Sequence, residues 1–252
     1  MRLGRVVIDG ETTPRRVVIE EKDWFAWEGD DWLAPQKGAK IEGNGRLVAP
    51  LDPGKIVCVG LNYLDHVTEN DPNRTVPDEP VLFMKPPSAV IGPGETIHIA
   101  NRDNRTDYEA ELALVIGTTA SRVSANDWRA YVAGFTCAND VSDRVLQKKD
   151  GQWIRAKGFY TYCPVGPWIE TELDLDLAVV QSRLNGELRQ DQPVSSMIFP
   201  IPMLFEYITG IMALEPGDLV LTGTPFNVGP MQTGDSIEVS VSGIGVLANP
   251  VA

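Results

Sequence analysis

The chain has 252 residues, 43% of them hydrophobic and 23% charged, which is typical of a globular protein with a sizeable core. Its formal net charge is −13. Nucleic-acid-binding surfaces need clustered lysine and arginine, so we expect no nucleic-acid partner. Residues 1–20 lack an apolar segment and no run of 18 apolar residues follows, so we expect neither a signal peptide nor a membrane span.

The cysteines indicate a reducing compartment. There are three, Cys58, Cys137 and Cys163, an odd number in apolar surroundings. This pattern favours small buried thiols over a disulfide framework or a zinc site. We therefore expect a cytoplasmic protein.

Residues 1–50 are predicted to form a small β-rich domain. Short strand-like runs at residues 5–9 and 16–20 precede a tryptophan-rich stretch, and glycine and aspartate separate them. Residues 42–54 contain several glycines and prolines and read as a linker. Residues 51–252 would then form the second domain.

The first part of the second domain predicts a strand and then a short helix. An apolar run at residues 55–60 ends in glycine, and a helix over residues 63–69 would place His66 and Glu69 on one face. The alternative is an ordinary pair on a helix surface. Residues 70–80 carry three prolines and several acids, so we expect a mobile surface loop that closes over a ligand.

Residues 107–117 form an acidic stretch that continues into an apolar run ended by glycine, which predicts a strand buried on both faces. Strand alternation places Asp107, Glu109 and Glu111 on one face. Neighbouring carboxylates repel one another at the mouth of a buried strand, unless a cation lies between them. Hard oxygen ligands favour magnesium, manganese or calcium over zinc. A solvated acidic strand end is the alternative reading.

Later segments add a second carboxylate-bearing strand and the remaining elements. Residues 134–140 form an apolar run that ends in Asp140. Residues 124–127 resemble a capping box and predict a helix to about residue 133. Asn185-Gly186 predicts a hairpin turn, and residues 196–212 include an amphipathic helix. Many short strands with few helices predict a β-dominated α+β fold with a mixed or barrel-like sheet.

Several of these stretches together resemble the fumarylacetoacetate hydrolase superfamily, in its short bacterial and archaeal acylpyruvase-like or 2-hydroxyhepta-2,4-diene-1,7-dioate isomerase-like form. The resemblance runs in order from about residue 55 to the end. It rests on Val59-Gly60-Leu61-Asn62-Tyr63 with His66 and Glu69, Phe83-Met84-Lys85-Pro86, residues 108–117, Asn139-Asp140, Ala156-Lys157, Ser195-Ser196-Met197-Ile198-Phe199 and Leu221-Thr222-Gly223-Thr224-Pro225.

The resemblance implies a catalytic domain with a mixed β-roll or barrel, a homodimer, and one divalent metal, Mg²⁺ with Mn²⁺ or Ca²⁺ as alternatives. It assigns the residues as follows: metal ligands Glu109, Glu111 and Asp140; catalytic residues His66, Glu69 and Lys157; substrate contacts Arg144, Gln147 and Thr224. Without the resemblance, Lys157 reads as a solvated lysine and Thr224 as a residue that shapes the turn before Pro225.

We therefore expect a metal-dependent enzyme acting on small 2-oxo acids with a second carbonyl or carboxylate, through an enolate. Acylpyruvate hydrolysis or oxaloacetate-type decarboxylation comes first. The alternative is an isomerase or decarboxylase of aromatic degradation, acting on 2-hydroxyhepta-2,4-diene-1,7-dioate or 5-carboxymethyl-2-oxo-hex-3-ene-1,6-dioate. A catalytically silent metal-binding module is the rival from another class. The substrate would be a small 2-oxo acid or dicarboxylate.

Overall fold

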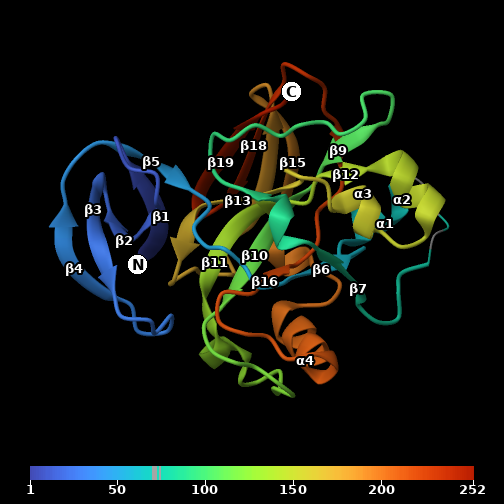
Figure 1. Cartoon of the computed structure of the whole chain (residues 1–252). Coiled ribbons are helices and arrows are strands. Elements are labelled where there is room, and N and C mark those ends of the chain that lie inside the picture. Colours follow the sequence, from blue (N-terminus) through green and yellow to red (C-terminus); the bar gives the residue numbers. More distant parts are fainter. Residues whose placement is uncertain (70–72, 74) are drawn as a thin grey trace.

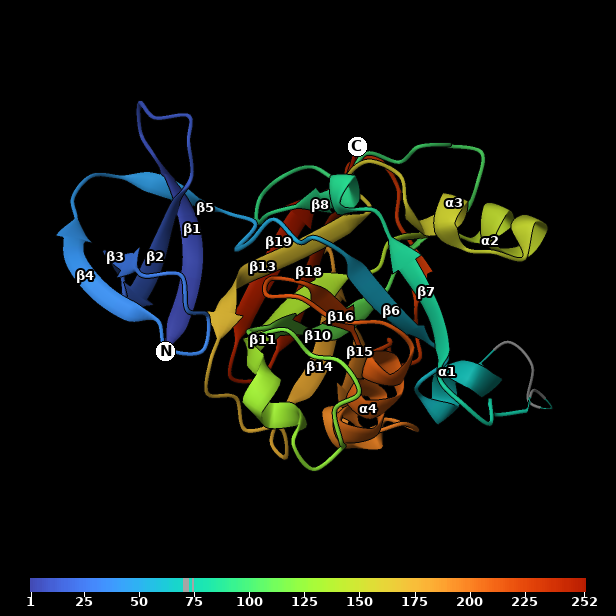
Figure 2. The same cartoon turned by 60° about the horizontal axis from the view of Figure 1, so that its bottom comes forward.

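The structure is a computed structural model that describes residues 1–69, 73 and 75–252. Residues 70–72 and 74 fall in the segment where we expect a mobile loop, and they lie outside the described residues, so this prediction stays a prediction. In the part that is described, strands form three sheets, and four short α-helices lie around them (Figures 1 and 2).

The largest sheet links the N-terminal strands to the centre of the molecule. Within the described residues its order is β4-β3-β2-β1-β13-β11-β10-β16-β6-β7, with β5 beside β1 and β8 beside β13. The bounds are β1 Arg2–Ile8, β2 Arg15–Glu20, β3 Asp23–Glu28, β4 Gln36–Ile41, β5 Gly45–Val48, β6 Ile56–Gly60, β7 Val81–Lys85, β8 Val90–Ile91, β10 Ala110–Ile116, β11 Val132–Asn139, β13 Cys163–Glu170 and β16 Leu219–Leu221.

Two smaller sheets and the helices complete the fold. One sheet has the order β12-β9-β17, with β12 Ser142–Asp143, β9 Thr106–Tyr108 and β17 Gly229–Pro230. The other has the order β15-β14-β18-β19, with β14 Val179–Leu184, β15 Glu187–Pro193, β18 Ser236–Val241 and β19 Gly245–Pro250. The helices are α1 Leu64–Thr68, α2 Arg144–Asp150, α3 Ile154–Lys157 and α4 Ile201–Ile211, and 3₁₀ turns are η1 Pro87–Ala89, η2 Trp128–Tyr131 and η3 Val194–Ser196.

The β-dominated α+β class is confirmed. The strand orders leave all three sheets open in the described part of the chain, so the expected roll or barrel takes the form of packed open sheets. Strands β1–β5 form a lobe on the left of Figure 1, and β1 pairs with β13 at its edge. One continuous sheet runs across the proposed domain boundary near residue 50, because β1 pairs with β13. The division into two domains stays a prediction.

The apolar strand of the sequence lies at the centre of the core. Strand β10 is buried along its whole length; Leu112 and Leu114 face one core cluster, and Ala113 and Val115 face another. Helix α4 packs Leu204, Phe205 and Ile208 against the first cluster. These contacts anchor β10, so the acidic residues at its start are held by a rigid strand.

Two local predictions had different outcomes. Asn185 and Gly186 form the expected hairpin turn between β14 and β15, with φ of 53° and 81°. The helix expected over residues 124–133 is wrong: the chain makes only the 3₁₀ turn η2 and enters β11 at Val132. Ser124 Oγ accepts from the Asn126 N–H in a local turn, and the pairing of Val132 with Ile116 draws the following residues into the sheet.

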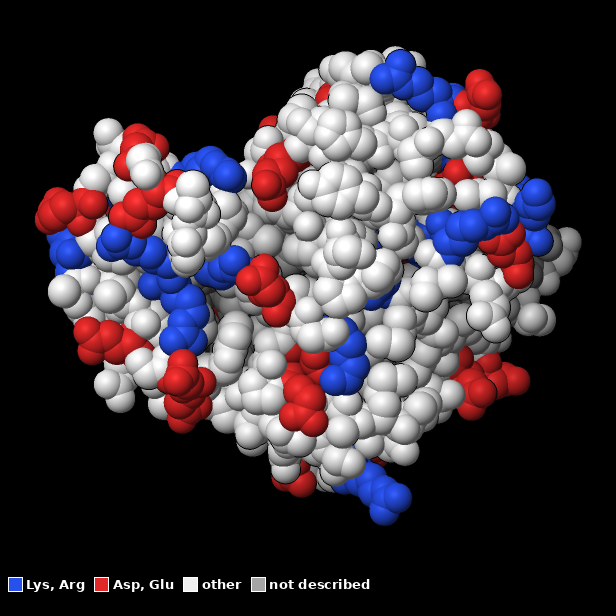
Figure 3. Space-filling model, viewed as in Figure 1, with Lys and Arg blue, Asp and Glu red and all other residues white. Residues whose placement is uncertain are grey.

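The three cysteines are buried free thiols, as expected. Among the described residues, no helix is long and apolar enough to span a membrane. On the face seen in Figure 3, acidic and basic side chains are interspersed and do not gather by sign.

Buried Asn62 ties three segments together. Its Nδ2 donates to the carbonyls of Thr222 (2.8 Å) and Phe199 (3.2 Å), and its Oδ1 accepts from the Phe199 N–H (2.8 Å). We expect Asn62→Ala to lower the free energy of unfolding by about 2–4 kcal/mol, because it leaves buried backbone groups without partners. Urea unfolding measures this. Exposed Asn126→Ala is the control and should stay within about 0.5 kcal/mol of the parent; equal effects would contradict the prediction.

Candidate active site

Strand pairing brings the three predicted metal ligands together. In the antiparallel pair β10–β11, Ala110 lies opposite Asn139, and the Asp140 N–H donates to the Glu109 carbonyl at 2.9 Å. Glu109 and Asp140 are therefore neighbours at the ends of the two strands, and Glu111 follows two residues along β10 on the same face. Ligand oxygens of Glu109, Glu111 and Asp140 lie within 4.8 Å of one another. All three side chains are buried.

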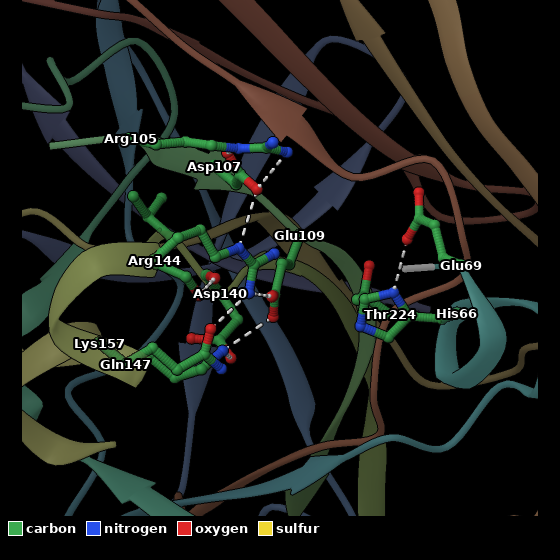
Figure 4. Close-up of polar contacts among 12 residues, drawn as sticks. His66, Glu69, Arg105, Asp107, Glu109, Asp140, Arg144, Gln147, Lys157 and Thr224 are labelled. Atoms are coloured by element: carbon green, nitrogen blue, oxygen red, sulfur yellow. Dashed lines mark hydrogen bonds and ion pairs between the residues drawn. The ribbon is translucent and has the colours of Figure 1, made fainter. Parts of the chain in front are cut away.

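Two lysines compensate part of this charge. Lys157 Nζ donates to Glu109 Oε2 at 2.8 Å and also contacts Asp140 Oδ2 (Figure 4). Lys85 Nζ, fully buried, donates to the other oxygen of Asp140 at 2.6 Å. Burial by itself would lower the pKa of Lys157, but the charges of Asp140 and Glu109 raise it above its usual value. Lys157 is thus held as a charged ammonium group.

The pKa values of Glu109 and Glu111 are shifted in opposite directions, although the two residues are only two positions apart. Burial opposes the charge of Glu109, but Lys157 and Arg144 outweigh it and lower the pKa of Glu109. Burial also opposes the charge of Glu111, and the charges of Asp140 and Glu109 add to this, so the pKa of Glu111 is raised well above its usual value. Glu111 is the uncompensated member of the cluster.

The donor set fits a hard divalent cation. It consists of carboxylate oxygens, which Mg²⁺, Mn²⁺ and Ca²⁺ prefer. In the described part of the chain Glu111 has no ion-pair partner, and its polar contact is the Gly223 N–H at 2.7 Å. Gly223 has a φ of 100°, and a Cβ there would lie 2.8 Å from the Cβ of Asn62, so glycine is required for this contact. A bound metal ion would therefore supply the positive charge that compensates Glu111.

His66 and Glu69 form the predicted pair. His66 Nδ1 lies 3.1 Å from Glu69 Oε2, and the other oxygen of Glu69 accepts from the Asn227 N–H at 2.8 Å. Helix α1 carries His66, and Glu69 caps its C-terminal end. Asn227 belongs to the segment between β16 and β17, so a distant part of the chain holds Glu69 in place. An ordinary pair on a helix surface would not need such a contact.

Arg144, at the start of α2, connects the cluster to a further carboxylate. It contacts Glu109 Oε1 at 2.6 Å through Nη1, Gln147 Oε1 at 2.9 Å through Nη1, and Asp107 Oδ2 at 2.8 Å through Nε. Arg105 holds Asp107 from the other side, with Nε at 2.8 Å and Nη2 at 3.0 Å. Asp107 therefore binds two arginines and does not join Glu109 and Glu111, contrary to the alternation argument.

The reason is a change of sheet at Glu109. Asp107 belongs to β9 in the three-stranded sheet, whereas Glu111 belongs to β10 in the large sheet. Alternation holds within one continuous strand, and the chain is not one strand here.

Thr224 is held by the backbone around it. Its Oγ1 donates to the Ala110 carbonyl at 2.9 Å and accepts from Gln190 Nε2 at 2.8 Å. Gln190 Oε1 in turn accepts from the Ala110 N–H at 3.0 Å. Thr224 lines the cavity, but these bonds also fit the turn-shaping role that the sequence left open.

The predicted residues converge on one cavity of about 30 Å³. Its wall includes His66, Glu109, Glu111, Asp140, Gln147, Lys157 and Thr224. Arg144 lines an adjoining chamber, and Glu69 reaches the site through His66. Placement thus agrees with the expected roles, and the roles themselves stay predictions.

Lys85 is a charged residue of the site that sequence reasoning left without a role, and Arg105 is another. The ion pair of Lys85 with Asp140 is fully buried. The available signal was one lysine at the end of the apolar run Leu82-Phe83-Met84, where a charge needs a buried partner.

The comparisons with known proteins agree with this fold and site. The family description "Fumarylacetoacetate (FAA) hydrolase C-terminal" matches residues 55–252. The chain therefore belongs to the fumarylacetoacetate hydrolase family, and it is an enzyme of that superfamily.

Three proteins illustrate what the chain is similar to. Protein Rv2993c of Mycobacterium tuberculosis is 46% identical over 100% of this chain and 98% of its own length. Rat oxaloacetate tautomerase Fahd2a, mitochondrial, is 38% identical over 81% of this chain and 69% of its own length. The crystal structure of 5-carboxymethyl-2-hydroxymuconate delta-isomerase from Mycobacterium smegmatis is 39% identical, with a TM-score of 0.91, over 100% of this chain and 99% of that one.

Glu111→Gln tests the cation site without an activity assay. It removes an uncompensated buried charge and keeps the side-chain volume, so we expect the metal-free variant to melt about 2–4 °C above the metal-free parent, roughly 1 kcal/mol. In the parent, Mg²⁺ or Mn²⁺ should raise the melting temperature by mass action. The variant should lose most of this rise.

Thermal unfolding after chelator treatment, with and without added metal, measures both effects. Glu21→Gln is the control, since Glu21 is exposed in the turn between β2 and β3. A full Mg²⁺-dependent rise in Glu111→Gln would contradict the assignment.

Proposed function

We propose that this enzyme moves a proton on a small 2-oxo acid by way of an enolate, with tautomerisation or isomerisation of a 2-oxo dicarboxylic acid as the first candidate. The observation that carries the proposal is the oriented His66–Glu69 pair on the cavity that Glu109, Glu111, Asp140 and Lys157 line. The names of the relatives, a tautomerase and an isomerase, support this choice over our first expectation of hydrolysis or decarboxylation.

The pair is arranged for proton transfer. An Nδ1–H of His66 that donates to Glu69 leaves Nε2 with a free lone pair, which is the form of a general base. Glu69 also stabilises the imidazolium that forms when His66 takes up a proton. The Asn227 N–H bond keeps the Glu69 carboxylate in position for this.

The proposed step starts from the keto form of the substrate. His66 takes a proton from C3, the C–H electron pair becomes the C2=C3 double bond, and the oxygen on C2 receives the negative charge. Lys157, held charged by its two carboxylates, faces the same cavity and stabilises that charge. A divalent cation bound by Glu109, Glu111 and Asp140 would supply further positive charge beside the 2-oxo group.

Return of the proton completes the reaction. Delivery of a proton to the oxygen on C2 gives the enol, delivery from His66 to C3 regenerates the keto form, and delivery to another position of a conjugated chain gives an isomer. The same residues serve both directions, as tautomerisation requires.

Hydrolysis of an acylpyruvate or decarboxylation of oxaloacetate is the second candidate, because breaking the C3–C4 bond leaves the same enolate. For hydrolysis, His66 would take the proton of an attacking water. Decarboxylation needs no water, so it should depend far less on His66. Nuclear magnetic resonance in D₂O separates the three reactions: tautomerisation exchanges hydrogen at C3 without cleavage, hydrolysis yields two acids, and decarboxylation yields pyruvate and CO₂.

His66→Ala tests the proposed base. We expect the enol-to-keto rate of oxaloacetate with Mg²⁺, followed by ultraviolet absorbance, to fall by roughly 10²–10⁴-fold, the usual contribution of a general base. Glu69→Gln should have a milder effect in the same direction, since it removes the charge that orients His66 but keeps the base.

His98→Ala is the matched control, because His98 is the other histidine of the chain and is exposed away from this cavity. An unchanged enol-to-keto rate in His66→Ala would contradict the assignment of His66 as the base. A parent protein that binds Mg²⁺ but turns over no 2-oxo acid would instead support the silent metal-binding module.

A further inference from the structure

A chamber of about 350 Å³ adjoins the small cavity at the carboxylate cluster. The two spaces share Leu61, His66, Gln147 and Trp153 in their walls. The inner cavity, about 30 Å³, has room for little more than the reacting end of a substrate. The rest of any substrate whose 2-oxo group lies at the cluster must therefore extend into the outer chamber.

The wall of this chamber is cationic. Arg105, Arg144 and Lys148 line it, and Asp107 is the acidic residue among its lining residues. Figure 4 shows Arg105 and Arg144 converging on Asp107 from opposite sides. One buried carboxylate thus holds two guanidinium groups near each other against their mutual repulsion, and it compensates for only part of their charge.

Both arginines keep donors available. Arg144 Nη2 is buried and has no hydrogen-bond partner, whereas its Nε and Nη1 are engaged. Arg105 uses Nε and Nη2 on Asp107, so Nη1 has no partner within the described residues. A buried guanidinium nitrogen without an acceptor is costly, which applies to Arg144 Nη2. Arg105 Nη1 belongs to a half-exposed side chain and is free to bind an acceptor that a ligand brings.

We infer that Arg105, held beside Arg144 by Asp107, binds a second carboxylate at the end of the substrate remote from the 2-oxo group, with Lys148 contributing charge. Arg105 is then a specificity-determining residue, Asp107 is a positioning residue, and the substrate class is the 2-oxo dicarboxylates. The inference rests on the proposed function only in placing the 2-oxo end at the carboxylate cluster.

The geometry makes Arg105 the discriminating group. Arg144 contacts Glu109 of the cluster, so it serves the reacting end as well. Arg105 contacts Asp107, on the side away from Arg144, and its side chain is about half exposed at the chamber. A substrate that ends in a methyl group would leave Arg105 without an acceptor, while a terminal carboxylate would gain a charge-assisted hydrogen bond.

The test uses two ligands of equal length, 2-oxoglutarate and 2-oxopentanoate, which differ by a terminal carboxylate in place of a methyl group. Calorimetric titration with Mg²⁺ present should give a Kd about 10- to 100-fold lower for 2-oxoglutarate, the range expected for a hydrogen bond to a charged group. In Arg105→Gln this ratio should fall about tenfold through 2-oxoglutarate alone. The 2-oxopentanoate Kd should stay within about twofold.

Two further variants separate charge from structure. Arg105→Lys keeps the charge but not the fork of donors, so it should retain part of the preference. Arg102→Gln is the matched control, since Arg102 is exposed on the same loop and does not line the chamber; its ratio should equal that of the parent. Because the chamber is open to solvent, added salt should reduce the preference in the parent.

Equal Kd values for the two ligands in the parent would overturn the inference. So would an Arg105→Gln variant that weakens both ligands by the same factor, which would mean that Arg105 acts only on the structure around Asp107. A parent that prefers 2-oxoglutarate yet turns over no 2-oxo acid would leave the subsite standing and refute the proposed function. Turnover without any preference would do the reverse.

Discussion

The structure around the site depends on one constraint, the burial of several carboxylates in a small volume. Asp107, Glu109, Glu111 and Asp140 are all nearly inaccessible to water. An isolated buried charge is strongly unfavourable, so each needs a compensating partner. Arginines compensate Asp107, Lys157 and Arg144 compensate Glu109, and Lys85 and Lys157 compensate Asp140. Glu111 remains, and this imbalance marks the place for a cation.

The fold supplies these partners from distant segments, except for Arg105, which lies two residues before Asp107. The carboxylates lie at the ends of β9, β10 and β11, whereas the cations come from β7, α2 and α3. The central strands bury their apolar side chains on both faces, which fixes the carboxylates. Helices α2 and α3 bring Arg144 and Lys157 to them, and β7 brings Lys85. A rigid cluster of carboxylates with cationic side chains beside it is well suited to hold the oxygens of a small acid.

Family membership leaves the choice of reaction open, because the proposed enolate would serve proton transfer, hydrolysis and decarboxylation alike. The inner cavity is built of groups that all three reactions can use. The outer chamber is different, since its cationic wall contacts the part of a substrate that does not react. Selectivity among 2-oxo acids is therefore better sought in Arg105, Arg144 and Lys148 than in the carboxylate cluster.

The sequence by itself determined the features that depend on short-range periodicity. The apolar run after Glu111 predicted a strand buried on both faces, alternation put Glu109 and Glu111 on one side, and Asn185-Gly186 predicted a hairpin turn. The ordered motifs from residue 55 predicted the family. These predictions held because each rests on a local pattern or on a set of motifs in order.

Tertiary structure alone decided the rest. The chain changes sheets at Glu109, so Asp107 leaves the face that alternation gave it and binds Arg105 and Arg144. The helix expected after Ser124 gave way to pairing of Val132 in β11. Lys85 is a buried partner of Asp140 although β10, β16 and β6 lie between β7 and β11 in the sheet order. No local pattern encodes the contacts of Lys85 with Asp140 and of Arg144 with Asp107, which join residues 55 and 37 positions apart. The burial of these charges becomes visible only when the sheets are assembled.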